Sequence, residues 1–565
     1  RRAMARSSPP LRRIIMAAAI HSVGAFTAFP APSLLPFSAA RHARRLVAGL
    51  ALHRPAGVLA QQASRAPGLR GGAAGMSCAA GSVAEKNLEG VYWQGLETLQ
   101  VARSMHEGNR DKVVKHMKLA GAAGMVLVQS GEEQNRAETD AGLLFRQESN
   151  FHYLFGVEHP GCFGTISLSD GSSTLFVPRQ PEAYTVWMGP PPSLEQVRAT
   201  YKVDTARYVD ELPKFLAESA PPLLHLYSGV NTDSGSKGTP AHFDGIDQYT
   251  REEVALHTAL YESRVIKSPD EIAVLRFASK VASQGHIEVM KQCRPGMMEY
   301  QLEAVFGHHC YMHGGMRSLA YTPIAGAGLN AAVLHYGHAG APNNREIGDG
   351  DMILSDMGAE YYCYASDITC SYPANGKFTP DQRSVYLAVL ECLRTVESHM
   401  KPGTSYVEMH QLVEKTLAKH LIGMGVLTGD LDEIVAAELP AVFMPHGLGH
   451  NLGLDTHDVG GYPLGSIRAT RPGLRALRNV RTLKEGMVLT VEPGCYFIPS
   501  ELDKALANPA QAKFMNAERI AGLRAFGGVR LEDNVVVTRD GHEVLTHVPR
   551  EIEEVEATMG SAYRS

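Results

Sequence analysis

From about residue 90 to residue 262, short apolar runs alternate with turn residues. The runs at 124–129 and 173–178 are rich in β-branched and other apolar side chains, and Gly or Pro stands at one end of each. Runs of this length bounded by turn formers are typical of buried strands, and the segment 193–200 between such runs is typical of a helix. We therefore predict an α/β domain over residues 90–262.

A strong helix start follows this region. In the run Ser-Pro-Asp-Glu at 268–271, a hydroxyl stands at the capping position, proline at the first helical position and glutamate three residues after the cap. Ile272 and Leu275 then recur at helical spacing. We predict a second domain at 263–553, with the domain boundary near its first residue, and a short polar tail at 554–565.

The second domain contains two stretches that resemble each other. Residues 294–302 are similar to 401–409, and each opens a predicted helix after a Pro-Gly turn. Residues 352–356 are similar to 487–492, and each is an apolar strand that finishes in a carboxylate. Two related halves that each deliver an acid from a strand end can build one site at their junction. Chance similarity between short apolar strings is the alternative explanation.

Two aspartates stand close together in the first of these halves. Asp356 ends its apolar strand, and Asp367 follows after a Gly turn and an aromatic run, so a hairpin can bring the two together. A buried carboxylate is costly unless a cation or hydrogen-bond donors compensate it. A single buried aspartate is usually a hydrogen-bonding cap, whereas two on one hairpin favour a metal. Glu492 and Glu532 end strands in the second half, and either one alone is unremarkable.

Three histidines cluster in the second half. His446 and His450 are separated by a segment with two glycines, which favours a loop over a helix, and His457 follows shortly afterwards. One such histidine is more often structural than functional. Three close together favour metal binding or proton transfer.

The charges of the candidate residues predict the kind of metal. Asp356, Asp367, Glu492 and Glu532 carry four negative charges, and His450 adds a neutral nitrogen. Two divalent ions cancel that charge, and oxygen-dominated ligation suits Mn²⁺ or Mg²⁺ and, less selectively, Co²⁺ or Zn²⁺. A pair of metal ions can activate one water molecule for attack on a carbonyl.

Composition excludes several other classes of protein. Hydrophobic residues make up 44% of the 565 residues and the formal charge is −5, which gives no basic surface for nucleic acid. After residue 90 no apolar stretch approaches the length of a membrane span, so we expect no membrane partner. The eight cysteines form no Cys-x-x-Cys pair, and we interpret them as reduced core thiols.

The first 85 residues differ from the rest of the chain. Before Glu85 there are many arginines and no acidic residue. That composition is typical of an organelle transit peptide, which predicts a plastid or a mitochondrial location. The alternative is translated upstream sequence, and a start at Met76 then predicts a cytoplasmic protein. We exclude residues 1–85 from the fold and expect this leader to be disordered.

Several longer runs give the chain a family resemblance. The specific runs are Phe-Arg-Gln-Glu-Ser, Gly-Val-Asn-Thr-Asp-Ser-Gly, Leu-His-Tyr-Gly-His-Ala-Gly-Ala-Pro, Tyr-Tyr-Cys-Tyr-Ala-Ser-Asp-Ile-Thr and Phe-Met-Pro-His-Gly-Leu-Gly-His, at 145–149, 229–235, 334–342, 361–369 and 443–450. Together they resemble the M24 metallopeptidases, over about 91–555. The resemblance implies an α/β (α+β) fold class. A smaller N-terminal domain of the creatinase/aminopeptidase P type would precede a pita-bread domain with a pseudo-twofold internal repeat.

The resemblance implies a function and a set of site residues. The match is close to the members that hydrolyse Xaa-Pro dipeptides to a free amino acid and proline with two divalent metal ions, and Mn²⁺ is the ion implied. Asp367 and Glu532 would bridge the ions, Asp356 would complete one site, and His450 and Glu492 the other. The implied catalytic residues are Glu492, which would carry a proton to the leaving nitrogen, His335 and His457.

The resemblance also implies a substrate pocket. Arg478 would bind the C-terminal carboxylate of the dipeptide, a contact that favours dipeptides over longer peptides. The other substrate-binding positions are His335, His457, Tyr321 and Arg530.

Other positions are less well defined by the resemblance. His446 has no assigned role. Trp187 either lies on a loop that covers an active site, that of its own chain or of a partner subunit, or is a buried core residue. Pro323 and Ala325 stand where animal-type relatives tend to have cysteines, a departure in the pocket wall.

Two other functions share much of this pattern. An aminopeptidase that removes Xaa-Pro from longer peptides would keep every metal ligand, so Arg478 is the discriminating residue. A non-catalytic binding protein with this fold would be expected to lose ligands, and this sequence keeps all five. By analogy with dimeric relatives, we expect a homodimer.

Overall fold

The computed structural model describes residues 90–95 and 97–561, so the predicted leader lies outside the described residues. The N-terminal domain is built on a six-stranded mixed sheet in the order β6-β5-β4-β3-β7-β8. Strand β3 pairs antiparallel with β4 and parallel with β7. The strands are β3 (Met125–Gln129), β4 (Phe163–Ser167), β5 (Ser173–Val177), β6 (Thr205–Tyr208), β7 (Leu224–Leu226) and β8 (Arg251–Glu252), and a short pair β1 (Val91–Tyr92) and β2 (Val101–Ala102) precedes them.

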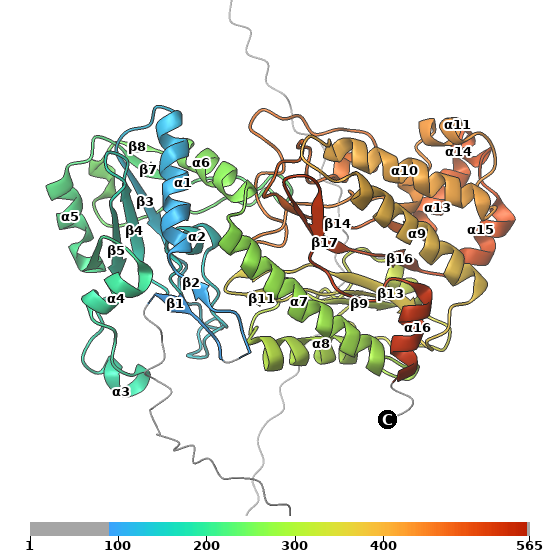
Figure 1. The fold of residues 1–565 in the computed structure, drawn as a ribbon, viewed down its shortest axis with the longest axis horizontal. Coiled ribbons are helices and arrows are strands. Elements are labelled where there is room, and N and C mark those ends of the chain that lie inside the picture. Colours follow the sequence, from blue (N-terminus) through green and yellow to red (C-terminus); the bar gives the residue numbers. More distant parts are fainter. Residues whose placement is uncertain (1–89, 96, 562–565) are drawn as a thin grey trace, which may run out of the picture. The chain divides into compact units, whose positions relative to one another are not determined.

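Helices cover both faces of this sheet, as the alternation along β3 requires (Figure 1). Successive side chains of a strand point to opposite faces. Val126 and Val128 belong to the core cluster that includes α1, whereas Met125 and Leu127 pack with the residues of α5. The helices are α1 (Met105–Leu119), α2 (Ser149–Phe155), α3 (Tyr184–Met188), α4 (Leu194–Tyr201), α5 (Leu212–Ser219) and α6 (Ala255–Val265). The predicted strands at 124–129 and 173–178 and the predicted helix at 193–200 are all present.

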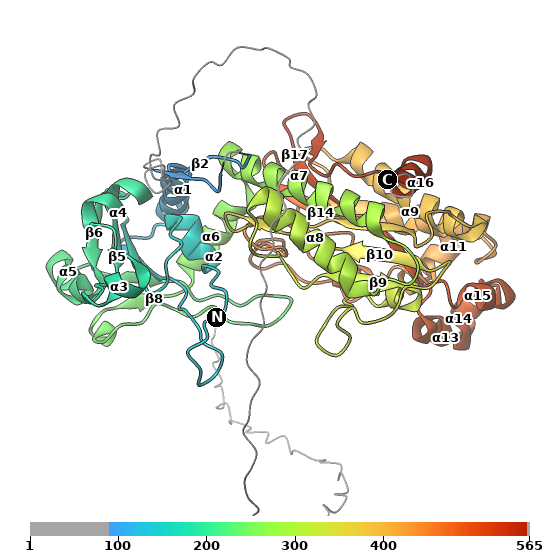
Figure 2. The same cartoon turned by 90° about the horizontal axis from the view of Figure 1, so that it is seen from below.

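The second domain begins with two long helices that lie side by side (Figure 2). Ser268 caps the first of them, and its side chain and that of Glu271 form the reciprocal capping box predicted from the sequence. A second helix pair follows later in the chain. The pairs are α7 (Pro269–Gln292) with α8 (Glu299–Gly314), and α9 (Pro380–His399) with α10 (Tyr406–Gly423).

Each helix pair packs on its own set of strands, which gives the predicted repeat of two related halves. The first sheet has the order β13-β10-β9, and Ile353 of β10 shares a core cluster with α7 and α8. The second has the order β14-β17-β18, and Leu489 of β14 shares a cluster with α9 and α10. The strands are β9 (Ile324–Ala327), β10 (Met352–Asp356), β13 (Thr369–Pro373), β14 (Val488–Val491), β17 (Asp533–Val537) and β18 (His542–Val544), with the small pairs β11 (Glu360–Tyr361) and β12 (Tyr364–Ala365), and β15 (Gly494–Tyr496) and β16 (Gly528–Arg530).

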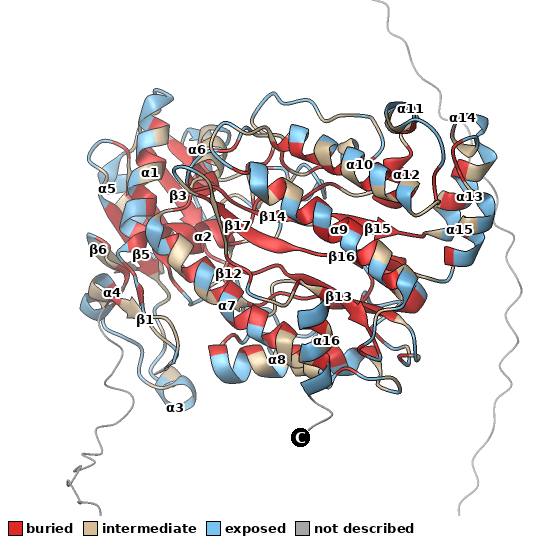
Figure 3. Ribbon diagram, turned by 45° about the vertical axis from the view of Figure 1, so that its right-hand side comes forward, coloured by how far each residue is buried: buried red, intermediate tan, exposed pale blue. Residues whose placement is uncertain are grey.

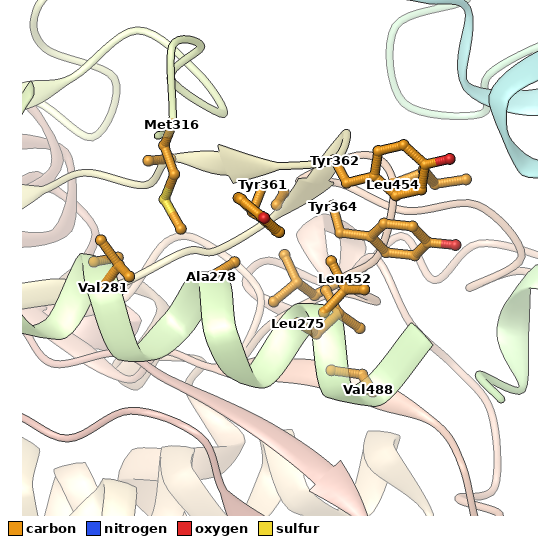
Figure 4. Packing of buried hydrophobic residues seen from close by; sticks show 14 of the residues in the cluster. Leu275, Ala278, Val281, Met316, Tyr361, Tyr362, Tyr364, Leu452, Leu454 and Val488 are labelled. Atoms are coloured by element: carbon orange, nitrogen blue, oxygen red, sulfur yellow. The ribbon is translucent and has the colours of Figure 1, made fainter. Parts of the chain in front are cut away.

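The core lies beneath these helices (Figure 3). In Figure 4, Leu275, Ala278 and Val281 project from α7 toward Tyr361 and Leu452, and all of these side chains are buried. Burial of one leucine side chain stabilises a fold by about 1.5–3 kcal/mol. The aromatic run that follows Asp356 is therefore held firmly against α7. The remaining helices are α11 (Leu431–Ala436), α12 (Pro440–Phe443), α13 (Pro499–Ala507), α14 (Pro509–Ala512), α15 (Ala517–Leu523) and α16 (Ile552–Gly560).

The ends of the second domain differ in detail from the expected ones. Helix α6 continues past residue 263 to Val265, and the break in helical structure comes immediately before the Ser268 cap. Residues 554–560, expected in a polar tail, belong to α16, and Val555 and Met559 are buried because they lie one helical turn apart on the face that meets the core. Over residues 90–95 and 97–561, no helix combines the length and the apolar character that a membrane span needs.

Candidate metal centre

The first two predicted acids lie on one hairpin. Strand β10 ends at Asp356, and its partner β13 begins at Thr369, which pairs with Asp356 across the ladder. Asp367 lies two residues before Thr369, so the two carboxylates come together as their spacing predicts. The hydroxyl of Tyr321 lies between them, 2.5 Å from Oδ1 of Asp356 and 2.6 Å from Oδ1 of Asp367.

The second two acids occupy equivalent places in the other half. Val491 at the end of β14 pairs with Asp533 at the start of β17. Glu492 directly follows β14, and Glu532 directly precedes β17. Glu532 also joins the two halves. Its Oε2 accepts a hydrogen bond of 2.7 Å from Oγ1 of Thr369, and its backbone N–H donates to the carbonyl of the same threonine.

A glycine-containing loop brings His450 to these acids. Residues 448–452 run antiparallel to β14, with hydrogen bonds from Glu492 to Leu448 and from Thr490 to His450. A Cβ on Gly449 would lie 2.2 Å from the carbonyl oxygen of Thr490, so this close approach requires glycine.

The His450 ring faces the carboxylates. Its Nε2 lies 3.3 Å from Asp367, 3.6 Å from Glu492 and 4.0 Å from Glu532. Its Nδ1 lies 3.0 Å from the carbonyl oxygen of Asn451, and a proton on Nδ1 donates to that oxygen. This hydrogen bond leaves the Nε2 lone pair directed at the acids, which is the arrangement of a metal-ligating histidine.

The electrostatics of the site call for additional positive charge. Burial, together with the charge of Glu532, raises the pKa of Glu492 to about 8. Burial and mutual repulsion also raise the pKa values of Asp367 and Glu532 well above their ordinary range. Among the described residues, Arg530 is the one arginine or lysine that donates to a side-chain carboxylate of these acids, through a 2.5 Å contact from Nη2 to Oδ2 of Asp356. One guanidinium does not balance four carboxylates.

The donor set therefore fits divalent cations. Asp367, His450 and Glu532 each offer one ligand atom, and these three atoms lie within 4.8 Å of one another. All three residues are buried. Carboxylate oxygens with one imidazole nitrogen are ligands that suit Mn²⁺, Mg²⁺ and Zn²⁺.

All predicted site residues line one cavity of about 920 Å³. They are the acids Asp356, Asp367, Glu492 and Glu532, the histidines His335, His450 and His457, and Tyr321, Arg478 and Arg530. Nη1 of Arg478 donates to Nδ1 of His457 at 3.0 Å. Desolvation in the cavity, with His450 and Arg478 nearby, lowers the pKa of His457 to about 2, so its ring is neutral and can accept this hydrogen bond.

His446 also lines the cavity, and its ring contacts a supporting residue. Its Nε2 lies 3.0 Å from the hydroxyl of Tyr496, which accepts a hydrogen bond from Nη1 of Arg530 at 2.8 Å. Burial lowers the pKa of His446 to about 3. His446 therefore supports Arg530, and through it Asp356, by way of Tyr496.

Sequence reasoning missed some residues of the cavity. Asn231 and Asp455 line it, and Asp233 lies 3.7 Å from Arg478. Asn231 and Asp233 belong to the run 229–235 that carries the family resemblance, which is the signal that could have identified them. Trp187 is 84% exposed and does not line this cavity, so the alternative of a buried core residue is wrong.

Known sequences match both domains. The pattern of Metallopeptidase family M24 matches residues 273–539, and that of the Aminopeptidase P N-terminal domain matches residues 106–224. Xaa-Pro dipeptidase of Homo sapiens is 53% identical over 471 residues, which are 83% of this chain and 96% of the human protein. The probable Xaa-Pro aminopeptidase pepP of Sclerotinia sclerotiorum is 37% identical over 455 residues, 80% of each protein.

Solved structures agree with these matches. Zinc-substituted Escherichia coli aminopeptidase P in complex with product is similar with a TM-score of 0.67 and 32% identity, over 82% of this chain and 99% of that one. Pseudomonas aeruginosa aminopeptidase PepP is similar with a TM-score of 0.68 and 30% identity, over 83% of this chain and 100% of that one. Since sequence relatives and solved structures agree along both domains, this chain belongs to metallopeptidase family M24.

Proposed function

We propose that this chain hydrolyses Xaa-Pro dipeptides to a free amino acid and proline. The observation that carries the proposal is one cavity that unites five potential metal ligands with Arg478, in a chain 53% identical to human Xaa-Pro dipeptidase over 96% of that protein. A planar guanidinium can hold a carboxylate through two hydrogen bonds. The C-terminal carboxylate of a dipeptide is then the group that Arg478 recognises.

Family membership and the ligand cluster imply divalent metal ions, and we propose Mn²⁺ as the resident ion. Asp356, Asp367, His450, Glu492 and Glu532 would hold two such ions. When bound, the ions supply Lewis-acid activation of the scissile carbonyl and of the attacking water. Predominant oxygen ligation supports Mn²⁺ over softer metals.

The side chains around the metal ligands would position the substrate and move the proton. An amide nitrogen is a poor leaving group, so the enzyme must protonate the proline nitrogen as the bond breaks. The carboxylate of Glu492 accepts a proton from the attacking water and passes it to that nitrogen. His335 and His457 provide hydrogen bonds to the tetrahedral intermediate and to the bound substrate. Both line the same cavity as Glu492.

We also propose a homodimer. Val186, Trp187 and Met188 form an apolar segment of α3 that is 79%, 84% and 67% exposed, which supports a contact with another chain. Equilibrium sedimentation checks this proposal. The compartment depends on residues 1–85, which lie outside the described residues, and mass spectrometry of the native N-terminus distinguishes an organellar protein from a cytoplasmic one.

The decisive experiment compares Gly-Pro with Gly-Pro-Ala in Mn²⁺ and in excess chelator. We expect hydrolysis of Gly-Pro in Mn²⁺, little hydrolysis in chelator, and much slower cleavage of the tripeptide. In Arg478→Ala, we expect the preference for the dipeptide to fall. A wild-type preference for Gly-Pro-Ala would instead establish the aminopeptidase activity that the fungal relatives' names suggest. No hydrolysis of either peptide, despite bound metal, would leave the fold serving as a binding module.

A further inference from the structure

The N-terminal domain contributes to the end of the cavity that holds Arg478. A short hairpin in this domain is closed by a bridge between Val230 and Lys237, and its tip carries Asn231 and Asp233. Asn231 lines the cavity. The backbone N–H of Asp233 donates to Oδ1 of Asn231 at 2.9 Å, which fixes the turn.

The carboxylate of Asp233 lies between two arginines of the catalytic domain. Nη2 of Arg468 donates to its Oδ1 at 2.6 Å, and Nη1 of Arg478 lies 3.7 Å from its Oδ2. The first contact is a charge-assisted hydrogen bond, whereas the second is an ion pair without a hydrogen bond. The side chains of Asp233 and both arginines are only partly exposed, between 26% and 30%.

Arg468 connects Asp233 to the backbone next to Arg478. Its Nη1 donates to the carbonyl oxygens of Arg475 and Leu477, at 3.2 and 3.3 Å. Its guanidinium carbon lies 4.2 Å from the centroid of the Tyr462 ring. Asp233 therefore acts on Arg478 both directly and through the backbone of the preceding residue.

These contacts leave one edge of Arg478 for a ligand. Within the described part of the chain, the hydrogen bonds and ion pairs of the Arg478 guanidinium all involve Nη1, which contacts His457 and Asp233. The Nε–Nη2 edge has the geometry for bidentate binding of a carboxylate. Two guanidinium groups and one carboxylate also sum to a single positive charge, which one substrate carboxylate neutralises.

We propose that Asp233 is a positioning residue that holds Arg478 in the orientation needed to bind the C-terminal carboxylate of the substrate. The N-terminal domain would thereby complete the substrate pocket of the catalytic domain. This inference rests on the proposed dipeptidase function. It assigns Asp233 and Arg468 a role in substrate affinity and none in bond cleavage.

The test is a double-mutant cycle on Gly-Pro hydrolysis by the Mn²⁺-loaded full chain, with Asp233→Asn, Arg468→Gln and the double variant. We expect each single variant to raise KM by about threefold to fivefold, as the loss of one partly exposed ion pair would, with kcat within about twofold of wild type. Because Arg468 holds Asp233 beside Arg478, the combined effect in the double variant should be smaller than the product of the two single effects. Asp210→Asn is the matched control, since Asp210 pairs with Arg179 on the same domain and does not line the cavity.

Other outcomes overturn the inference. A KM that is unchanged or lower in Asp233→Asn would mean that Asp233 does not position Arg478, and a lower one would mean that it competes with the substrate. Multiplicative effects in the double variant would mean that the residues act separately. A fall in kcat together with a loss of thermal stability or of bound metal would indicate a merely structural role. Wild-type protein that fails to hydrolyse any Xaa-Pro dipeptide would refute the proposed function itself, whatever the variants do.

Discussion

Replacement of Asp458 by asparagine should destabilise the protein markedly. Asp458 accepts hydrogen bonds from Nη2 of Arg264 at 2.5 Å and from Nζ of Lys267 at 2.8 Å, and all three side chains are at most 2% exposed. Asparagine has nearly the same shape but carries no charge, and its amide oxygen can accept from only one of the two cations while its N–H groups face the other. The variant therefore leaves two buried cations with less counter-charge, without creating a cavity.

The size of the effect follows from what each cation retains. Arg264 keeps a second carboxylate, because its Nη2 also donates to Asp455 at 2.7 Å, whereas Lys267 loses the carboxylate that accepts its hydrogen bond. Removal of one partner from a buried pair costs about 3–5 kcal/mol, and the remaining Asp455 contact favours the lower end. The fall in Tm equals the lost free energy divided by the unfolding entropy of the protein. With about 2.1 cal/mol/K per residue over about 470 described residues, a loss of about 3 kcal/mol lowers the Tm by about 3 °C.

The assay is thermal unfolding of wild type, Asp458→Asn and Asp503→Asn, in the same buffer and at the same metal concentration. Asp503 pairs with Arg524 on an exposed surface, so its variant should unfold within about 1 °C of wild type. Although burial opposes it, the charges of Lys267 and Arg264 hold the pKa of Asp458 below its ordinary value. The contribution of the Asp458 carboxylate to stability is therefore complete above the unfolded pKa of about 4, and it is lost only as the pH falls through the lower folded pKa. The difference in Tm between wild type and Asp458→Asn should therefore be equal at pH 7 and pH 5. An Asp458→Asn protein as stable as the Asp503→Asn control would refute the reasoning.

Three further predictions concern catalysis, metal and the core. Glu492→Gln removes the proposed proton carrier and should lower kcat for Gly-Pro by at least about 100-fold, and wild-type turnover would exclude Glu492 from proton transfer. Dialysis against a chelator should abolish Gly-Pro hydrolysis and lower the Tm, because the acids lose their compensating charge, and added Mn²⁺ should restore both. Activity that survives with no metal detected by elemental analysis would contradict this prediction. Leu275→Ala, at a fully buried position, should cost about 2–5 kcal/mol in chemical denaturation, whereas Leu119→Ala, at a position 77% exposed, should change little; equal losses would contradict the assigned packing.

Local signals predicted much of the fold and the centre of the site. The Ser268 cap, the two aspartates of one hairpin and the glycine-containing loop that carries His450 are each encoded within a few neighbouring residues, so capping, spacing and turn chemistry were sufficient to identify them. The helix at 552–560 was missed for a different reason. Its buried residues, Ile552, Val555 and Met559, lie among glutamates, and a short helix with so few apolar positions resembles a polar tail when sequence alone is considered.

Contacts between distant segments could not be predicted in this way. Asp233 and Arg468 are 235 residues apart and belong to different domains, and only the folded structure shows that they meet beside Arg478. Likewise, the path from His446 through Tyr496 to Arg530 depends on the placement of a loop and two strands. No periodicity in the sequence specifies such a meeting, because each residue alone satisfies the ordinary rules for a surface loop or a strand end.

The placement of the acids also explains why both halves of the catalytic domain are needed. Each half alone would present two like charges at paired strand ends, and the first half would lack the arginine that pairs with Asp356. In the structure, Asp356 of the first half is paired with Arg530 of the second, and Thr369 of the first half donates to Glu532 of the second. These two polar contacts between the halves lie at the metal centre. Metal binding should therefore stabilise the interface between the halves as well as the acids, and loss of metal should loosen that interface before it affects the hydrophobic cores beneath α7 and α9.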